Sequence, residues 1–464
     1  PLAGFRSFRD AWYQRPGYSQ VLRERGVSTR DLDLLKRDVL DNKLPQVSWI
    51  VATAEGSEHP GPSSPAQGAD YTARVLEALT ANPEVWSKTV LFINFDENDG
   101  FFDHMPPPAV PAYEAYDADP AKARLAGAST VDTTGEYHHQ LNGSDARYHH
   151  RPYGLGPRVP MYVVSPWTNG GWGNSQVADH SSVLRFIEAR FGVQEPLISP
   201  WRRAVCGDLT SCFDFGSPQD GPFIGELPAT AALRARAQAL VNTKTPATPG
   251  ALVAPVQLEG VRPARALPYE LQVQARQQGN TLVLRFENEG EAGAVLHVYN
   301  RLDLGALPRR YTVEAGKSLE GQWTAAPNGQ YDLWVLGPNG FHRHVMGQLS
   351  QLPQRAQPEV LARADRANGE LLLTLSNEGR LPCTFLLQAL KYLEQPVQEL
   401  PLAAGQRIEL RLPLAESRHW YDLLLRVKEL PGYARRLAGH LENGEPSISD
   451  PAMSGPAQLD QFRL

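Results

Sequence analysis

The chain has 464 residues, of which 42% are hydrophobic and 21% charged, a balance typical of folded globular domains. Its formal net charge is −6 and no long basic stretch offsets it, which argues against a nucleic acid as partner. No apolar run reaches the roughly 18 residues that a membrane-spanning helix needs. A chain of this length predicts about three domains.

Residues 1 to 215 alternate between helix and strand patterns. "STRDLDLLKRDVLD" predicts a helix from Ser28, because Asp31 follows three residues later as in a capping box. "DYTARVLEALTANP" predicts a second helix from Asp70, and "DHSSVLRFIEARFG" a third that ends at Gly192. The apolar runs "QVSWIVAT", "TVLFINF" and "RVPMYVVSPW" predict strands. This alternation predicts an α/β fold with a mostly parallel sheet.

Residues 109–157 break the alternation, being rich in Ala, Asp, Tyr, Gly and His without a clear period. A segment of this length inside a compact domain is usually a functional loop or a disordered one. The doublets His138-His139 and His149-His150 are interpreted as loop residues, because no spacing fixes them together.

The later residues change to short alternating apolar runs that repeat. "NTLVLRFENEGEAG" corresponds to "GELLLTLSNEGRLP", so that Asn288 matches Asn377 and Tyr331 matches Tyr421. Two copies of a unit with about seven short strands predict tandem β-sandwiches. The expected domains are an α/β portion, a linker, two β-domains and a tail, at residues 1–215, 216–262, 263–350, 357–443 and 444–464.

The stretch "KTVLFINFDENDGFFDHMPPP" ends a predicted strand with acids and a histidine. Ligands of open α/β sheets bind at the carboxyl ends of strands, where Asp96 and Glu97 would lie. Carboxylate oxygens suit hard divalent cations, and His104 would then act on a phosphoryl oxygen or a leaving group. The alternative is that both acids only cap a following turn.

Two further histidines follow predicted strands or begin helices. His59 lies in the loop "SEHPGPSS", and the alternative is a solvated surface histidine. His180 lies at the start of a predicted helix, where the dipole favours anions. Its alternative is that Asp179 or Ser181 caps the helix and His180 is incidental.

Three cysteines allow at most one internal disulfide. Cys206 and Cys212 are close enough in "CGDLTSC" to close a small loop, or they are two buried thiols. In the β-domains, His342 and His344 alternate along a predicted strand but lack a third ligand, so they indicate no metal site.

Taken together, the ordered motifs resemble the bacterial phosphocholine-preferring phospholipase C family. That family belongs to a phosphoesterase group which also includes a secreted acid phosphatase, within the alkaline-phosphatase-like superfamily. The resemblance covers nearly the whole chain. It is carried by the β repeats and by "LPQVSWIV", "SEHPGPSSPAQGADY", "TVLFINFDENDGFFDHMPPP", "PYGLGPRVPMYVVSPWTNGGW" and "DHSSVLRFIEARFGVQEPLISPWRRAVCGDLTSCFDF".

The resemblance implies an alkaline-phosphatase-like α/β domain, partly present, followed by two all-β sandwich-like domains. It implies metal-assisted cleavage of phosphatidylcholine, or sphingomyelin, to phosphocholine and diacylglycerol or ceramide, through a covalent phospho-enzyme. By position, Asp96 and Glu97 would ligate a divalent metal of unknown identity, and His59, His104 and His180 would be catalytic. A secreted or periplasmic location is implied in the same way.

One part of the family pattern is missing. The Glu-Asn ligand pair of an "ENRSFDH"-like motif and the Thr or Ser nucleophile do not occur in this chain. The chain begins at Pro1, and we therefore expect it to lack the N-terminal segment of the catalytic domain and to be inactive alone. An accessory or export partner is left open.

A choline headgroup binds on aromatic faces, which makes Tyr153 and Trp172 candidate substrate-binding residues. The alternative is aromatic packing under a long loop. The β-domains would be accessory, for lipid-surface docking, partner binding or stabilisation. A phosphomonoesterase and a non-catalytic relative that keeps only the fold are the rival functions.

Overall fold

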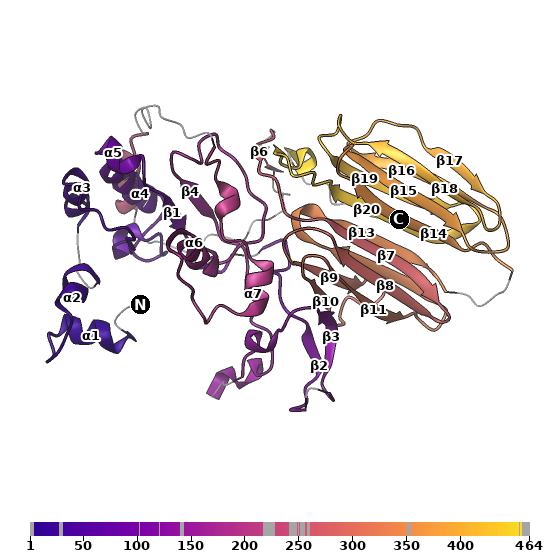
Figure 1. The fold of residues 1–464 in the computed structure, drawn as a ribbon, viewed down its shortest axis with the longest axis horizontal. Helices are drawn as coiled ribbons and strands as arrows, with labels where there is room; N and C mark the ends of the chain where they lie inside the picture. The colour runs from indigo at the N-terminus through magenta and orange to yellow at the C-terminus, as the bar shows by residue number, and fades with distance from the viewer. Residues whose placement is uncertain are drawn as a thin grey trace. The chain divides into compact units, whose positions relative to one another are not determined.

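The computed structural model describes residues 4–26, 31–101, 103–119, 121–139, 143–216, 228–240, 248, 250, 256–257, 260–349, 354–453 and 455–456 (Figure 1). The chain divides into two compact units. The first holds Pro1–Ile93, Tyr162–Asn169 and Phe215–Gly250, and the second holds Asn94–Met161, Gly170–Asp214 and Ala251–Leu464. Within the described ranges, no helix has both the length and the apolar composition to cross a membrane.

The first unit is built mainly of helices that pack on a small sheet. Val39, Val75 and Trp86 are buried in its core, against partly buried Leu91 and Val164. The sheet has two strands, β1 (Leu91–Asn94) and β4 (Met161–Val164). The helices are α1 (Arg6–Trp12), α2 (Gln20–Gly26), α3 (Leu32–Leu40), α4 (Pro65–Leu79), α5 (Pro83–Trp86) and α8 (Ala231–Gln238).

Two predictions for this unit need correction. Helix α3 begins after Asp31, whose Oδ1 accepts a hydrogen bond from the Leu34 N–H at 2.9 Å, and the predicted start at position 28 lies outside the described residues. Residues 46–53 form no strand, and Trp49 and Val51 are 65% and 76% exposed. A strand needs a neighbour for its backbone hydrogen bonds, and β1 and β4 pair only with each other.

The second unit begins with the segment that the sequence predicted to be irregular. Two strands lie in it, β2 (Ala112–Ala115) and β3 (Arg124–Ser129), followed by helices α6 (Ser181–Phe191) and α7 (Pro200–Val205). Strand β3 pairs in parallel with β10 (Arg309–Val313). The prediction of irregular structure was wrong here because the partner strand lies far away in the sequence.

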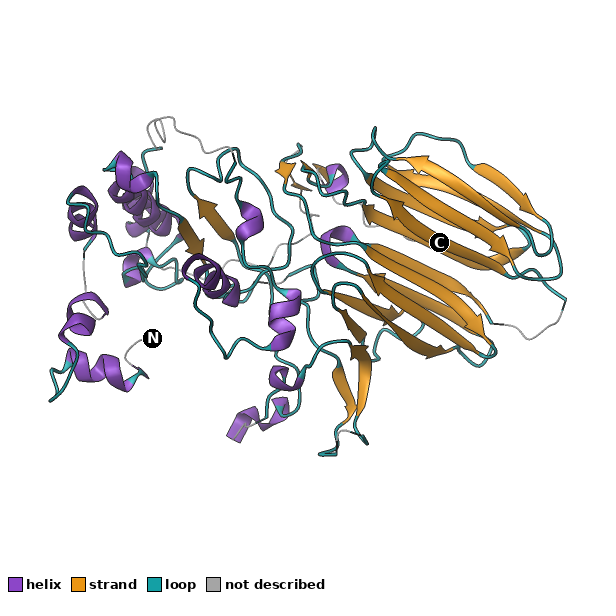
Figure 2. Cartoon of the chain, viewed as in Figure 1, coloured by secondary structure: helices purple, strands orange, loops and turns teal. Residues whose placement is uncertain are grey.

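The first β-domain comprises seven described strands, β7 to β13, and the second comprises seven more, β14 to β20, as predicted. The first domain has β7 (Leu271–Gln278), β8 (Thr281–Asn288), β9 (Ala294–Asn300), β10, β11 (Lys317–Thr324), β12 (Gln330–Leu336) and β13 (His342–Gln348). The second has β14 (Pro358–Asp365), β15 (Glu370–Asn377), β16 (Cys383–Lys391), β17 (Gln398–Leu402), β18 (Arg407–Pro413), β19 (Trp420–Val427) and β20 (Leu430–His440). Figure 2 shows these strands stacked in layers, with helix only as short turns between them.

The two β-domains share one sheet. Strand β13 pairs antiparallel with β20, which joins both domains into a ten-stranded sheet of order β17-β16-β19-β20-β13-β12-β9-β10-β3-β2 (Figure 1). Smaller sheets, β11-β8-β7 and β14-β15-β18, complete the two sandwiches. Across the shared seam, the Arg343 guanidinium donates to the Tyr421 hydroxyl at 3.0 Å, and Arg435 donates to Tyr331 at 2.9 Å. Each domain thus donates from one arginine to a tyrosine of the other domain, an arrangement with approximate two-fold symmetry.

The seam also contains a buried acid in the second domain. Glu359 on β14 is 8% exposed, and burial raises the pKa of its carboxyl from 4.5 to about 7, although the nearby Arg435 lowers it. Glu359 pairs in the sheet with Ser376, the residue before Asn377. Gln272 of the first domain pairs in the same way with Glu287, the residue before Asn288, so Glu359 and Gln272 occupy equivalent positions. The first domain therefore has a neutral amide where the second has an acid.

We expect Glu359→Gln to remove a pH dependence of folding stability. Because the folded pKa lies above the ordinary value, the stabilising contribution is complete below pH 4.5 and is lost as the pH rises through about 7. The unfolding free energy of the wild type should fall over this window by on the order of 3 kcal/mol relative to the variant. Urea unfolding of both proteins between pH 4 and about 8 measures the difference.

Glu416→Gln is the matched control, since Glu416 is exposed in the same domain. Its pH profile should follow the wild type. Parallel profiles for wild type and Glu359→Gln would contradict the assignment.

Candidate active site

The acidic pair lies at the carboxyl end of β1, as the sequence predicted. Asp96 and Glu97 are both exposed, and the Glu97 N–H donates to Asp96 Oδ1 at 3.1 Å. The chain then turns sharply at Asp99 and Gly100, with φ values of 52° and 71°. Carboxylates on the surface of a turn keep oxygens accessible to solvent.

Asp103, which follows the same turn, is locked in an ion pair. The Arg158 guanidinium donates to it through Nη2 at 2.8 Å and Nε at 3.0 Å, and the Arg158 N–H donates at 2.8 Å. These hydrogen bonds hold the pKa of Asp103 far below its usual range. A carboxylate held in this way is a poor general base, and its effect is to anchor the loop that carries the exposed His104.

His180 reaches the same strand end from helix α6. Its Nε2 lies 2.9 Å from the carbonyl oxygen of Phe95, the residue before Asp96. A carbonyl oxygen only accepts, so Nε2 must carry the proton. Asp179 Oδ1 accepts a hydrogen bond from the Ser181 N–H at 3.0 Å at the start of the helix, whose N-cap residue is His180.

A partly buried arginine holds this helix start in place. Arg202 on α7 pairs with Glu136 at 3.0 Å and with Asp179. The side chains of Glu136 and Asp179 are only 3% and 7% exposed. Ser199 Oγ donates to Glu136 at 2.5 Å, which adds to the compensation of the buried charge.

The same network extends to the candidate headgroup residue. The Tyr153 N–H donates to the Glu136 carbonyl oxygen at 2.9 Å, and the Tyr153 ring centroid lies 4.0 Å from that of His138. Arg202 thereby connects the backbone of the tyrosine segment with the segment that carries His180. The sequence by itself does not indicate roles for Arg202, Glu136 and Arg158, because only the fold shows which charged side chains face one another.

Two other predicted residues, His59 and Trp172, make contacts of their own. His59 belongs to the first compact unit, where its exposed ring places Nδ1 3.2 Å from the Gly61 carbonyl oxygen. The ring of Trp172 is covered on one side by the Arg265 guanidinium, 4.4 Å from its centroid. A protein cation already uses the aromatic face that was predicted for a headgroup.

The structure also shows the state of the cysteines and the contact made by a histidine of the first β-domain. Cys206 and Cys212 are free thiols rather than a disulfide, and Asn174 Nδ2 lies 3.3 Å from the Cys212 sulfur. His344 pairs with Asp332 at 2.6 Å, as part of the strand packing in the first β-domain.

The described residues contain no group of three or more His, Cys, Asp and Glu side chains that could hold a metal ion. The donor chemistry of Asp96 and Glu97 fits a hard divalent cation, whose preferred ligands are carboxylate oxygens. Two carboxylates, however, fill only part of the coordination sphere of such a cation.

Three segments of the chain match models of known families. Residues 1–194 match the Phosphoesterase family, and residues 263–348 and 355–440 each match the bacterial phospholipase C C-terminal domain. The first segment is thus similar to the phosphoesterase family, and the two later segments are similar to phospholipase C C-terminal domains.

Individual relatives agree along nearly the whole chain. The chain is 49% identical to the non-hemolytic phospholipase C of Pseudomonas aeruginosa, over 98% of this chain and 64% of that protein. It is 46% identical to the non-hemolytic phospholipase C of Burkholderia pseudomallei, over 98% and 63%. It is 39% identical to the hemolytic phospholipase C of Pseudomonas aeruginosa, over 97% and 63%. The chain thus spans less than two thirds of the length of these relatives.

We expect Arg202→Gln to loosen the start of α6 and to destabilise the second unit. Removing the guanidinium leaves Glu136 and Asp179 buried without a counter-charge, which costs about 3 kcal/mol or more. Hydrogen exchange at the Ser181 and Ser182 amides should accelerate, and the urea midpoint should fall.

Arg203→Gln is the matched control, because Arg203 is the next residue of α7 and pairs with Glu188 at 2.9 Å near the other end of α6. It should leave exchange at Ser181 and Ser182 unchanged. Equal exchange in both variants would show that Arg202 does not hold the helix start.

Proposed function

We propose that this chain forms part of a phosphodiester hydrolase that cleaves phosphatidylcholine to diacylglycerol and phosphocholine. The observation that carries the proposal is the exposed acidic pair at the end of β1, with His180 bonded to the preceding residue. The identity to proteins named phospholipase C, over nearly the whole chain, supports the same reaction class.

In this proposal, Asp96 and Glu97 would hold a divalent cation, which would supply Lewis acidity at a phosphoryl oxygen. His180 fixes the backbone at Phe95 and so orients both acids. His104, exposed on the loop anchored by Asp103, would serve phosphoryl contact and proton transfer. The nucleophile that forms the phospho-enzyme and the remaining metal ligands come from residues outside these 464, consistent with relatives that are longer than this chain.

The headgroup would be bound by aromatic side chains of the second unit. Tyr153 is 51% exposed and its backbone is fixed by Glu136, which makes it the better supported of the two aromatic candidates. Trp172 would take part only if a ligand ammonium displaced Arg265 from its ring. A secreted or periplasmic location and a lipid surface as the place of reaction complete the proposal.

We expect Asp96→Asn and Glu97→Gln each to lower phosphatidylcholine turnover by about 100-fold or more, because a lost anionic ligand weakens the metal and its effect on the phosphoryl group. The assay uses the longest natural polypeptide that contains this chain, with phosphocholine release as the readout and the 464-residue chain in parallel. The shorter chain should show no turnover.

Asp99→Asn is the control from the same turn, because asparagine tolerates the positive φ of that position. It should retain wild-type turnover. Full activity of both ligand variants would refute the metal assignment. A preference for a simple phosphate monoester over phosphatidylcholine would instead favour the phosphomonoesterase reading.

We expect Tyr153→Ala to weaken phosphocholine binding by about fivefold, since a ring face contributes on the order of 1 kcal/mol to holding an ammonium. Trp172→Ala should have the smaller effect, because Arg265 covers that ring. Calorimetric titration of both variants measures the affinities. Unchanged affinity in both would remove the aromatic headgroup site.

A further inference from the structure

One loop of the first β-domain carries three exposed leucines. Leu302, Leu304 and Leu307 lie between β9 and β10 and are 49%, 64% and 55% exposed. We call residues 302–307 the leucine loop, and Asp303 is its only charged residue. A single exposed leucine is ordinary on a protein surface, but three on one short loop concentrate apolar surface in one place.

The backbone of the leucine loop is bonded within the protein. The Leu302 N–H donates to Asn300 Oδ1 at 3.1 Å, and the Asp303 N–H donates to the Asn300 carbonyl oxygen at 3.1 Å. The Ala306 N–H donates to the Asp303 carbonyl oxygen at 3.3 Å. Peptide groups that already have protein partners lose less when they leave water, so this loop can enter an apolar phase at a reduced cost.

The second β-domain supplies an internal comparison. Its equivalent loop, residues 392–397, lies between β16 and β17. There Leu393 packs against the domain core, and the Tyr392 hydroxyl donates to Asp450 at 2.8 Å. Val397 is the large apolar side chain that this loop leaves exposed, at 52%. The β-sandwich therefore does not require exposed leucines at this position, and the first domain has them for another reason.

The leucine loop shares its end of the ten-stranded sheet with the β2–β3 hairpin. Since β3 pairs in parallel with β10, the residues before β10 and the residues before β3 lie at the same end of the sheet (Figure 1). Leu125 at the start of β3 and Tyr116 directly after β2 are also exposed. The Tyr116 ring stacks on His150 with centroids 3.3 Å apart, and His150 lies three residues before Tyr153. The segment with the candidate headgroup residue thus contacts this end of the sheet.

The charges at this end of the sheet nearly cancel. Residues 116–124 of the hairpin hold two acidic and two basic side chains. Arg309 at the start of β10 lies 3.9 Å from Glu114, and Arg301 lies 3.2 Å from Asp332. The leucine loop adds one negative charge. A surface of this kind has no electrostatic attraction for anionic lipid headgroups and suits a surface without net charge.

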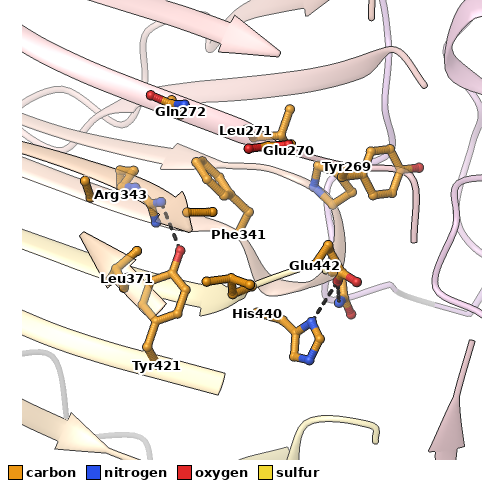
Figure 3. A pocket seen from close by; sticks show the side chains of 15 residues that line it. Tyr269, Glu270, Leu271, Gln272, Phe341, Arg343, Leu371, Tyr421, His440 and Glu442 are labelled. Atoms are coloured by element: carbon orange, nitrogen blue, oxygen red, sulfur yellow. Dashed lines mark hydrogen bonds and ion pairs between the residues drawn. The ribbon is translucent and has the colours of Figure 1, made fainter. Parts of the chain in front are cut away.

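The shared sheet gives the leucines one direction. Figure 3 shows the seam between the two β-domains, where Arg343 of the first domain is bonded to Tyr421 of the second. From β9 to β16 the order of the sheet is β9-β12-β13-β20-β19-β16, and every neighbouring pair is antiparallel. The leucine loop and its counterpart, residues 392–397, therefore lie at opposite ends of the sheet. Only the first of these two loops presents leucines.

We propose that the leucine loop inserts into a zwitterionic phospholipid surface and docks the protein on it. The three leucine side chains leave water for the boundary between headgroups and acyl chains, which the hydrophobic effect favours. Leu125 and Tyr116 add apolar contact beside the loop. The identity of the surface rests on the proposed function, because phosphatidylcholine, the proposed substrate, is zwitterionic and lies in a bilayer.

The test is sedimentation of the 464-residue chain with sucrose-loaded phosphatidylcholine vesicles. The wild type should bind, and the combined variant Leu302→Ser, Leu304→Ser and Leu307→Ser should bind about 100-fold more weakly, because each half-exposed leucine adds roughly a factor of five. Raising sodium chloride to about 0.5 M should not weaken wild-type binding, since salt screens charges and not apolar insertion. The melting temperature of the combined variant should match that of the wild type, because the replaced side chains lie on the surface.

Val397→Ser is the matched control, since Val397 is exposed on the equivalent loop at the other end of the sheet. It should bind vesicles as the wild type does. No binding by the wild type, equal binding by the wild type and the combined variant, or binding only after anionic lipid is added would each overturn the proposal. Analytical ultracentrifugation tests a second copy of the chain as the occupant, and a wild-type dimer that the combined variant abolishes would also overturn it.

The longest natural polypeptide that contains this chain separates this inference from the proposed function. Its vesicle binding is measured with Asp96→Asn, so that the lipid stays intact, and its phosphatidylcholine cleavage is measured without that change. Loop-dependent binding by a protein that does not cleave phosphatidylcholine would refute the hydrolase and support the docking surface. Cleavage by a protein whose vesicle binding is independent of the leucines would refute only the docking surface. Loss of vesicle binding in the longer polypeptide would also refute it, because another segment would then cover the leucines.

Discussion

The parallel pairing of β3 with β10 is the contact on which the arrangement of the second unit depends, because it joins the segment after the acidic pair to the first β-domain. The pairing is close enough to dictate a residue. Gly127 lies opposite Arg310 with φ of 121°, and a Cβ atom there would meet the Arg310 carbonyl oxygen at 1.8 Å. Only glycine can occupy such a position. Trp201 reinforces the junction, since its indole N–H donates to Thr312 Oγ1 at 3.0 Å in a fully buried site.

That junction gives the charged network a rigid base. Helix α7 carries both Trp201, which is anchored on the sheet, and Arg202, which pairs with two buried carboxylates. An isolated arginine could not satisfy both acids unless the helix were fixed first, because long charged side chains lose entropy when they are held. Packing of Trp201 therefore supports the ion pairs of Arg202, which in turn fix the helix start that carries His180.

The two β-domains show how one sequence pattern can be used twice with different results. Asn288 and Asn377 make the same bonds, since each side chain donates to the carbonyl oxygen four residues later at 2.8 Å. Arg343 and Arg435 likewise exchange hydrogen bonds with the tyrosines of the opposite domain. The domains differ at the edge strands, where one copy keeps a buried amide and the other a buried acid. A difference of this kind is decided by what each side chain faces across the seam.

Local pattern determined much of this protein. The apolar period gave helix α6 and its end at Gly192, the repeat gave two seven-stranded domains, and the strand end at Asp96 and Glu97 was visible as acids after an apolar run. These features depend on residues within one turn or one strand of each other, so the sequence is sufficient to predict them. Tertiary structure alone decided the strands β2 and β3, the loss of the strand predicted at residues 46–53, and the partners of Arg202. Each of those depends on a distant backbone or charge, and a residue's own sequence neighbours do not say which distant group it will meet.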